Sequence, residues 1–334
     1  SLTRIAPFMI RAEQLTKCFG SFAAISDVTF QVERGEIVGF LGPNGAGKTT
    51  TMRILGGVFP PTSGRALVGG YDVVAEPLRA RSIVGYFPER VSLYLDMTVR
   101  EYLRYVAEMK GVERSQRRTD IERALESCGV AHMAHRIIGT LSKGYRQRVG
   151  IAQALIGQPR VLILDEPTAG LDPEQVAEMR RLIRDLRGER TVILSTHILS
   201  EVEATCDRVM IINRGRLLAV DTPHNLSQRL RQTSQIYLEV LGPTQAVVDR
   251  VRAVPGVLHV EPTRSAPDGL AALTVTTEKE RDLRAELAAC VTAQWRLQEL
   301  RPVILSLEAI FLSLLNPEQN ASPTDHEIPS RLSA

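Results

Sequence analysis

Gly42-Pro43-Asn44-Gly45-Ala46-Gly47-Lys48-Thr49-Thr50 fits the pattern G-x-x-x-x-G-K-[ST], and the rest of the chain is interpreted around it. Residues 35–41 before it predict a turn and a buried strand, and residues 50–55 after it can continue as a helix. A strand, a glycine loop and a helix in this order form the context in which the pattern marks a phosphate site. The glycines let successive backbone N–H groups converge on a phosphate, and the helix N-terminus adds a favourable dipole.

The side chains of this loop have separate expected roles. Lys48 would reach the β- and γ-phosphates of a nucleotide, and the hydroxyl of Thr49 would ligate Mg²⁺. The other predicted nucleotide-binding residues of the loop are Asn44, Gly45, Gly47 and Thr50. The alternative is a glycine-rich turn with a chance lysine, and the flanking strand and helix argue against it.

Two further apolar runs end in groups that suit phosphate chemistry. Residues 161–164 predict a buried strand that ends in Asp165 and Glu166, and paired acids there are costly unless a cation uses them. Asp165 is therefore expected in the Mg²⁺ shell, and Glu166 is expected to polarise an attacking water. The strand predicted over 191–196 ends in His197. A lone histidine at a strand end is usually ordinary structure, but a neighbouring Asp165 strand would bring it towards the γ-phosphate.

Composition bounds the function classes. The 334 residues are 44% hydrophobic and 24% charged, with a net charge of +3 and no dense basic stripe, so no nucleic-acid partner is expected. No window of 18 apolar residues is present. The four cysteines are far apart without C-x-x-C spacing, which disfavours a zinc site or a disulfide framework and fits a reducing cytosol. They are Cys18, Cys128, Cys206 and Cys290.

The order of these motifs, together with Leu141-Ser142-Lys143-Gly144-Tyr145-Arg146-Gln147-Arg148 at a helix start, resembles the ATP-binding cassette (ABC) family over about residues 9–225. The resemblance implies an α/β fold: a P-loop cassette with a β-sheet core and a helical subdomain that carries the Leu-Ser-x-Gly signature. It implies ATP hydrolysis with ATP and Mg²⁺ as ligands. Lys48, Glu166 and His197 are then the expected catalytic residues.

The resemblance also gives roles to residues that local sequence leaves open. Phe19 taken alone favours a core residue at a strand end, whereas the family places an adenine-stacking aromatic there. Ser142 and Gly144 match signature residues that contact the γ-phosphate bound to the other subunit. Asp172, in Leu171-Asp172, matches a turn that crosses the dimer interface. Glu89 matches a position that contacts Mg²⁺ and faces the membrane partner.

Three positions depart from the commonest family pattern. Glu89 stands where glutamine is usual, which adds negative charge near the metal. Lys143 and Tyr145 replace the second glycine and the glutamine of the signature. The residues expected to carry out the chemistry are all present, so a catalytically dead, purely regulatory cassette is disfavoured.

The family mechanism predicts the partners. Two nucleotide sites form when two cassettes face head to tail, so we expect a homodimer, with twofold symmetry as the default. We also expect an integral-membrane permease as a separate subunit, and a cytoplasmic protein bound peripherally to the inner face of the membrane. The alternative is a soluble ABC ATPase that acts on ribosomes or DNA. Ribosome-acting relatives usually carry two cassettes, and DNA-repair relatives carry long coiled coils between loop and signature.

We expect residues 1–8 to be an extension, 9–225 the cassette, 226–316 an accessory domain and 317–334 a disordered tail. The accessory domain should have β-α-β-β-α-β order, which is ferredoxin-like. Its predicted elements span 235–241, 243–254, 256–261, 270–276, 278–290 and 295–303. A closing apolar helix over 306–315 suits core packing or partner binding. The domain could act in regulation, ligand sensing or dimerisation.

Its Leu-Glu-x-Ile-Phe-Leu ending at 307–312 resembles exporter ATPases of the drug-resistance, sodium-export and gliding-motility types. The segments 85–89 and 93–103 look closest to the gliding-motility subgroup.

Overall fold

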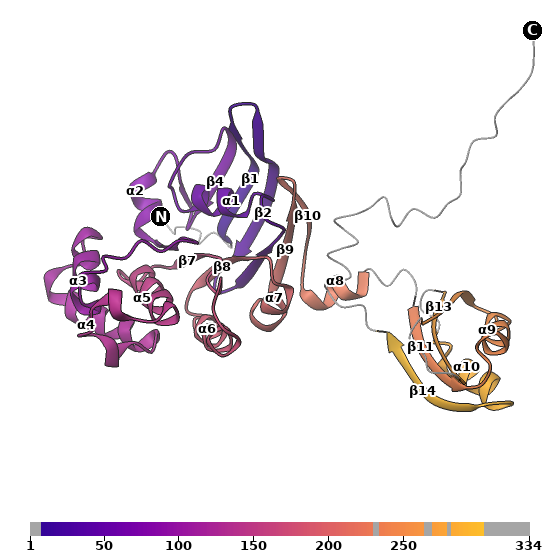
Figure 1. Cartoon of the computed structure of the whole chain (residues 1–334). Helices are drawn as coiled ribbons and strands as arrows, with labels where there is room; N and C mark the ends of the chain where they lie inside the picture. Colours follow the sequence, from indigo (N-terminus) through magenta and orange to yellow (C-terminus); the bar gives the residue numbers. More distant parts are fainter. Residues whose placement is uncertain (1–7, 230–233, 264–268, 279–281, 304–334) are drawn as a thin grey trace, which may run out of the picture. The chain divides into compact units, whose positions relative to one another are not determined.

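A computed structural model describes residues 8–229, 234–263, 269–278 and 282–303 of the chain (Figure 1). The chain divides into two compact units, Ser1–Pro223 and His224–Ala334. Each unit has a hydrophobic core of its own.

The first unit contains an antiparallel sheet with the strand order β2-β1-β4-β5. Its strands are β1 (Phe8–Phe19), β2 (Phe22–Glu33), β4 (Ser63–Val68) and β5 (Tyr71–Asp72). The sequence predicts short strands over residues 10–15 and 24–32, and β1 and β2 include both segments and extend beyond them. Together they form the β1–β2 hairpin, which ends at Phe19 and Phe22.

A second sheet of six strands has the order β10-β9-β3-β8-β7-β6. Its strands are β3 (Ile37–Leu41), β6 (Val84–Phe87), β7 (Val161–Asp165), β8 (Thr191–Thr196), β9 (Arg208–Asn213) and β10 (Arg216–Asp221). All pairs are parallel except β9 with β10. Parallel strands bring their carboxyl ends to one edge, which is where open α/β sheets bind ligands. The predicted glycine loop, carboxylates, Glu89 and His197 all follow strands at this edge.

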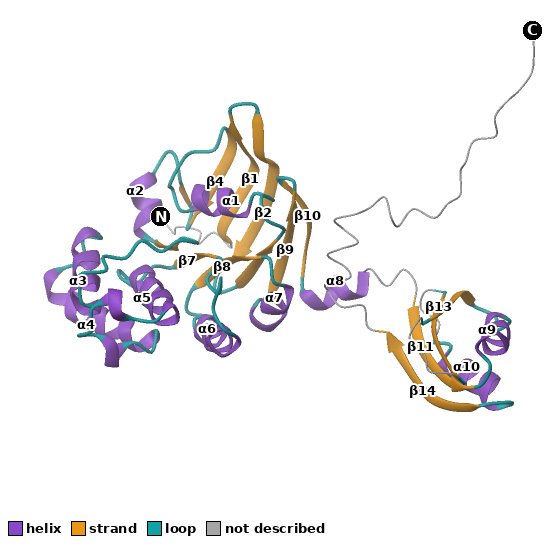
Figure 2. Cartoon of the chain, viewed as in Figure 1, coloured by secondary structure: helices purple, strands orange, loops and turns teal. Residues whose placement is uncertain are grey.

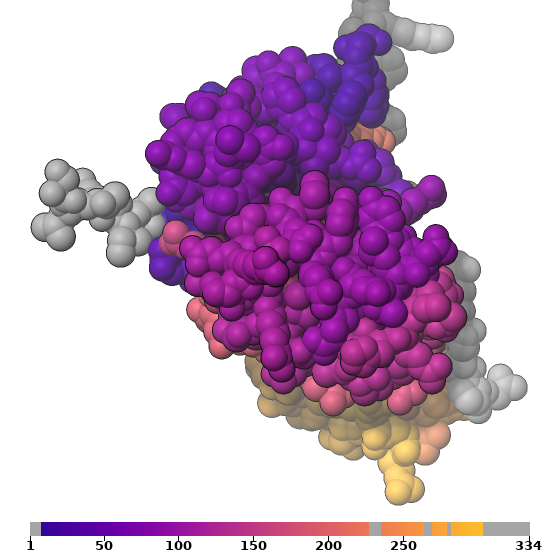
Figure 3. All heavy atoms as spheres, turned by 90° about the vertical axis from the view of Figure 1, so that its left-hand side faces the viewer, coloured from indigo at the N-terminus to yellow at the C-terminus, as the bar shows by residue number. Residues whose placement is uncertain are grey.

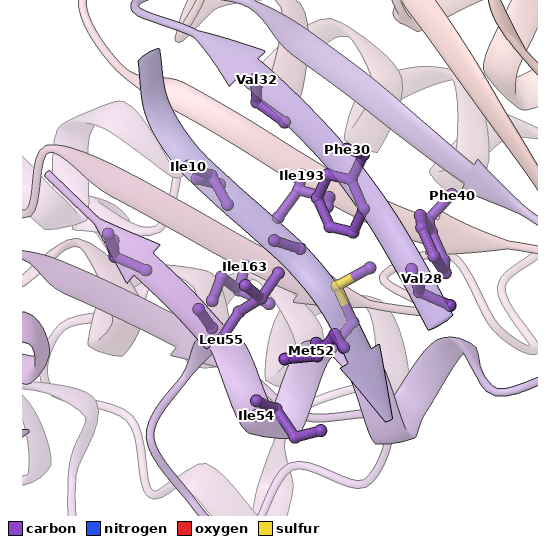
Figure 4. Close-up of a cluster of buried hydrophobic side chains, with 14 of the residues drawn as sticks. Ile10, Val28, Phe30, Val32, Phe40, Met52, Ile54, Leu55, Ile163 and Ile193 are labelled. Carbon is purple, nitrogen blue, oxygen red and sulfur yellow. The ribbon is translucent and has the colours of Figure 1, made fainter. Parts of the chain in front are cut away.

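Helix α1 (Lys48–Leu55) packs against strands of both sheets and completes the core between them. Figure 4 shows its Met52 and Leu55 among side chains of β1, β2, β7 and β8. Three other helices of this unit are α2 (Pro77–Ser82), α6 (Pro173–Asp185) and α7 (Leu199–Thr205). Burial of α1 from both sides fixes the glycine loop relative to β7 and β8.

Residues between β6 and β7 form a helical region, visible as clustered helices in Figure 2. It contains α3 (Val99–Met109), α4 (Arg114–Ser127) and α5 (Lys143–Leu155), with short 3₁₀ turns at Ala131–Met133 and Ile138–Thr140. The sequence predicts a polar stretch over residues 113–120, followed by a helix to Cys128; in the structure residues 114–120 are already part of α4. The prediction was wrong because arginine and glutamine are good helix formers and need no apolar period.

The second unit has the predicted β-α-β-β-α-β order. Helix α8 (Pro223–Arg229) begins at the boundary of the two units and precedes this pattern. The pattern consists of β11 (Ser234–Leu241), α9 (Thr244–Arg252), β12 (Val257–Pro262), β13 (Leu270–Thr277), α10 (Arg284–Thr292) and β14 (Arg296–Val303). The antiparallel sheet has the order β12-β13-β11-β14, as in ferredoxin-like folds. Helix α10 begins later than expected because Asp282 accepts a hydrogen bond from the Arg284 amide and forms a turn there.

Several expectations fall outside the described residues. These are the extension over most of residues 1–8, the closing helix over 306–315 and the tail over 317–334. Among the described residues, no helix combines the length and apolar character needed to cross a membrane.

The capping box of α3 gives a prediction for stability. Thr98 Oγ1 accepts from the Glu101 amide while the Glu101 carboxylate accepts from the Thr98 amide. Thr98→Ala removes one of these bonds and should lower the free energy of unfolding by about 1 kcal/mol in denaturant titrations. Thr119→Ala, an exposed position inside α4, is the matched control and should change it by less than about 0.5 kcal/mol. Equal effects of the two changes would contradict the role of the cap.

Candidate nucleotide site

The glycine loop occupies the carboxyl end of β3 and leads into α1. Gly47, the residue before α1, has φ of 106°, a conformation that side chains other than glycine rarely adopt. A Cβ at Gly47 would also lie 2.6 Å from Ile25 Cγ2, so the loop can approach β2 only with glycine there. The N-terminus of α1 borders the cavity described below, and helix N-termini that follow glycine loops bind phosphates in other proteins.

Lys48 lies across its own loop. Its Nζ donates to the carbonyl oxygens of Gly42 at 2.8 Å and Pro43 at 3.2 Å. The same Nζ is 3.4 Å from Glu166 Oε1, and both side chains are buried. A buried ammonium group held between the loop and a carboxylate provides a fixed positive charge next to the phosphate cradle.

Asp165 is fully buried at the end of β7. Thr49 Oγ1 donates to its Oδ1 at 3.2 Å, and Ser195 Oγ donates to the same oxygen at 2.5 Å. The other oxygen, Oδ2, is buried without a hydrogen-bond partner among the described residues. Burial raises the pKa of the Asp165 carboxyl above its usual value, while the bonds from Ser195 and Thr49 act in the opposite direction.

This donor set fits Mg²⁺. An unpartnered carboxylate oxygen beside a threonine hydroxyl at a phosphate loop is what Mg²⁺ needs, because the ion prefers oxygen ligands. The described residues hold no cluster of three acidic, histidine or cysteine ligands. Mg²⁺ is often held by one or two protein oxygens together with substrate phosphates and water, so the small donor set suits an ion that arrives with a nucleotide.

Glu166 is held in a constrained conformation at the start of the loop after β7. Its φ is 50°, and its amide donates to Ser195 Oγ at 2.9 Å. One carboxylate oxygen faces Lys48, and the other lies 2.9 Å from His197 Nδ1. Since β7 and β8 are paired in parallel, as expected, His197 follows the strand next to Asp165. Glu166 is thus oriented by three neighbours and turned towards the loop.

Lys48, Glu166 and His197 line one cavity of about 540 Å³, whereas the fully buried Asp165 is not among its lining residues. It brings together most of the predicted residues: Phe19, Asn44, Gly45, Gly47, Lys48, Thr49, Thr50, Glu89, Glu166 and His197. Phe19 is half exposed at the end of β1, with its ring edge-on to Phe59. The local expectation that it is a core residue was therefore wrong. The half-exposed ring borders the cavity, and Lys17 Nζ lies over it at 5.4 Å from its centroid.

The predicted signature residues lie around another cavity. Ser142 accepts from the Tyr145 amide at the start of α5, and Asp172 accepts from the Gln175 amide at the start of α6. Together with Gly144 they line a hollow of about 430 Å³ that shares no residue with the first. Gly144 packs against Gln175, where a Cβ would come within 2.7 Å of Oε1. Within one chain, the two groups of predicted site residues are separate.

Sequence reasoning missed two contributors. Ser195 forms hydrogen bonds with both Asp165 and Glu166. Its position next to Asp165 depends on the register of β7 and β8, which a single sequence does not reveal. Phe22, 63% exposed, lines the cavity from across the β1–β2 hairpin. An exposed aromatic two residues after the turn at Gly20 was the available clue.

Comparison with known proteins agrees with this geometry. The family model described as ABC transporter matches residues 25–169. The linearmycin resistance ATP-binding protein LnrL of Bacillus subtilis is 34% identical over 75% of this chain and 81% of its own length. The bacitracin transport ATP-binding protein BcrA of Bacillus licheniformis is 41% identical over 69% and 74%. A solved structure of an ATP-binding subunit of an ABC transporter is 30% identical, with a TM-score of 0.60, and covers 66% of this chain and 92% of that one.

The buried Asp165 charge yields a stability prediction. Its folded-state pKa is raised, so the charged carboxylate disfavours the fold at neutral pH, and this penalty disappears as the pH falls through the folded-state pKa. Asp165→Asn keeps an oxygen for Thr49 and Ser195 and should raise the melting temperature of the nucleotide-free chain by roughly 2–4 °C at pH 7, with a smaller gain at pH 4–5. Thermal unfolding with a chelator present measures it. Exposed Asp96→Asn should show no such gain, and a lower melting temperature for Asp165→Asn would contradict the argument.

Proposed function

This chain belongs to the ABC transporter family of ATP-binding subunits, which are ATPases, and we propose that two copies of it pair head to tail. The pair would power a separate membrane permease of the exporter type. The observation that carries the proposal is the separation of the predicted site residues into two cavities on one chain. One copy would supply Lys48, Asp165 and Glu166 around the phosphates. The other copy would supply Ser142 and Gly144, which would enclose the γ-phosphate from the opposite side.

The residues of the first cavity have matching roles in hydrolysis. The loop amides and Lys48 would hold the β- and γ-phosphates, and the half-exposed ring of Phe19 would stack on the adenine. Mg²⁺, held by Thr49 and Asp165, would neutralise phosphate charge, and Glu89 stands at the rim of the same cavity. Glu166 would accept a proton from the attacking water, with His197 at 2.9 Å fixing the direction of the carboxylate.

The second copy would contribute through a helix N-terminus. Ser142 caps α5, so its hydroxyl and the first amides of that helix can face an anion bound to the other chain. Asp172 at the start of α6 would lie near the twofold axis of such a pair. Identical surfaces on both copies make the contact self-complementary, as in most homodimers.

Exposed apolar side chains on α3 and just before it support a permease partner. Tyr94, Tyr105 and Met109 are 54%, 36% and 71% exposed, and the rings of Tyr94 and Tyr105 meet edge-on at 5.4 Å. We call these three residues the α3 apolar patch. Next to it lies a cavity of about 750 Å³ lined by residues 89–93, Leu95 and the start of α5, where Gln147 Oε1 is buried without a partner among the described residues. Apolar side chains around an unsatisfied polar group are typical of a protein-binding surface.

The names of the relatives support export. LnrL is named for linearmycin resistance and BcrA for bacitracin transport, so we propose export of a toxic compound chosen by the permease. A subunit of this kind would work at the inner face of the cell membrane.

Hydrolysis is tested with Glu166→Gln. Loss of the base should reduce ATP turnover on the order of 10²–10⁴-fold while ATP affinity stays within about threefold, because the phosphate contacts remain. The variant should also elute as a dimer when ATP is present, by size exclusion with light scattering. Glu203→Gln, an exposed change on α7, should hydrolyse ATP like the parent. Parental turnover in Glu166→Gln would remove this residue from the role of base.

The permease is tested by affinity purification from solubilised membranes. Tagged Glu166→Gln with ATP should retain a polytopic membrane protein, identified by mass spectrometry. Tyr105→Ser with Met109→Ser in the same background should retain at least about tenfold less of it, because two apolar anchors are lost. Leu218→Ser on β10, another exposed apolar position, is the control and should retain it fully. Recovery of ribosomal or DNA-repair proteins without a membrane protein would instead favour a soluble ABC ATPase.

A further inference from the structure

A basic groove lies between α3 and α4, on the side of the first unit that faces the viewer in Figure 3. Its volume is about 1030 Å³. Five arginines line it against two glutamates, with His135 beside them: Arg100, Arg104, Arg114, Arg117 and Arg118. We call this feature the α3–α4 groove; it shares no residue with the candidate nucleotide site or with the cavity beside the α3 apolar patch.

Two of the five arginines are engaged within the chain. Arg100 makes a bidentate pair with Glu122, at 2.5 and 3.2 Å. Arg117 pairs with Glu108 at 2.7 Å and donates to the Val112 carbonyl at 2.8 Å. Both glutamates of the groove are therefore already neutralised.

The other three arginines carry the excess charge. Within the described ranges, the side chains of Arg104, Arg114 and Arg118 make no hydrogen bond or salt bridge, and all three residues are exposed. An arginine presents a rigid fork of donors that matches phosphate and carboxylate oxygens. Three such forks directed at one groove form a site for an anion with several oxygens.

The position of these charges on α4 is unfavourable for the helix itself. Arg114 and Arg117 lie in the first turn of α4, which holds no acidic residue of its own, and Arg118 follows in the next turn. Glu113 precedes the helix as its N-cap residue. Cations in the first turn oppose the positive end of the helix dipole, and like charges three and four residues apart repel each other. An anion in the groove would reduce this repulsion and stabilise α4, which agrees with the ligand charge inferred from the lining of the groove.

We propose that the α3–α4 groove binds the phosphate headgroups of anionic membrane lipids. The assignment to lipid rests on the proposed function, because it takes α3 as the helix that meets the membrane subunit. Arg100, Arg104 and Glu108 are spaced four apart along α3, and Tyr105 and Met109 follow the adjacent line of the same helix. A chain docked through the α3 apolar patch would hold the groove at the edge of the contact, where lipid headgroups surround a permease. Clusters of arginine are attracted to anionic leaflets by their surface potential.

Vesicle sedimentation with the purified full-length chain tests the proposal. The probes are vesicles of phosphatidylcholine alone and of phosphatidylcholine with about 30 mol% phosphatidylglycerol, a strongly anionic composition. The parent should bind the anionic vesicles, bind the neutral ones far more weakly, and lose binding as salt rises. Arg104→Gln, Arg114→Gln and Arg118→Gln together should weaken the anionic binding on the order of a hundredfold, since each cation near the surface contributes to it.

The matched control removes the same charge elsewhere. Arg34, Arg181 and Arg184 are exposed, make no salt bridge within the described part of the chain, and lie outside the groove. Replacing these three by glutamine should change vesicle binding by about threefold or less. Equal losses in the two triple variants, or unchanged binding in the groove variant, would overturn the proposal. The groove variant should have the same melting temperature as the parent or a higher one, because it relieves repulsion between arginines in α4. A lower melting temperature would show that the variant is misfolded.

Two further measurements distinguish a lipid headgroup from other anions that the groove could bind. Glycerol phosphate at the concentration of accessible headgroups should displace little protein; full displacement would assign the groove to a free phosphorylated molecule instead. A short DNA duplex that binds with the same dependence on the three arginines, while vesicles do not, would assign it to nucleic acid. ATP turnover by the groove variant should equal that of the parent. A negative vesicle result with normal turnover therefore rejects the lipid site and leaves the ATPase intact.

Discussion

The buried carboxylate of Asp165 is the constraint on which the nucleotide site depends. It joins three separate segments, because Thr49 from α1 and Ser195 from β8 both donate to one of its oxygens. Ser195 in turn receives the amide of Glu166 and so fixes the direction in which that side chain leaves β7. The Asp165–Ser195 bond therefore holds the glycine loop and Glu166, the residue we propose as the base, in a fixed position relative to each other. The free oxygen that remains is costly in the fold and useful to a cation, so the site trades stability for function.

The separation of the predicted site residues into two cavities follows from how the chain is built. The helical region that carries Ser142 is inserted between β6 and β7, the two strands whose ends carry Glu89 and Glu166. Gly85 and Gly150 allow α5 and the segment after β6 to approach closely, since a Cβ at Gly85 would lie 2.3 Å from the Ala154 carbonyl. A shift of the helical region therefore acts directly on the strand that leads to Glu89. This packing is a physical route by which a partner on the α3 apolar patch could sense the state of the nucleotide site.

The sequence was sufficient where local pattern and fold agree. Apolar runs bounded by turns predicted β3, β7 and β8, because strands buried in a parallel sheet require continuous apolar sequence. The glycine loop predicted α1, because a helix follows the loop in this motif. It failed where an element owes its existence to neighbours or to weak propensities. The first turn of α4 has no apolar period, Phe19 is exposed because its hairpin extends beyond the core, and Ser195 acquires its role only through strand register. The division of the predicted site into two cavities is likewise a property of three-dimensional folding, and the family resemblance was needed to anticipate it.

Glutamate at position 89 changes the charge balance of the cavity. Asp165, Glu166 and Glu89 provide three carboxylates, while Lys48 lies in the cavity and Arg53 is close enough to act on Asp165. Glu89 adds to the raised pKa of Asp165 by charge repulsion, an effect that a neutral glutamine would lack. In the single chain Glu89 is exposed, so water screens most of this repulsion. In the head-to-tail pair that we propose, water would be excluded and the same charges would interact more strongly, so closure without a bound cation would be harder. A glutamate at position 89 would then tie closure of the proposed pair more closely to Mg²⁺ than a glutamine would.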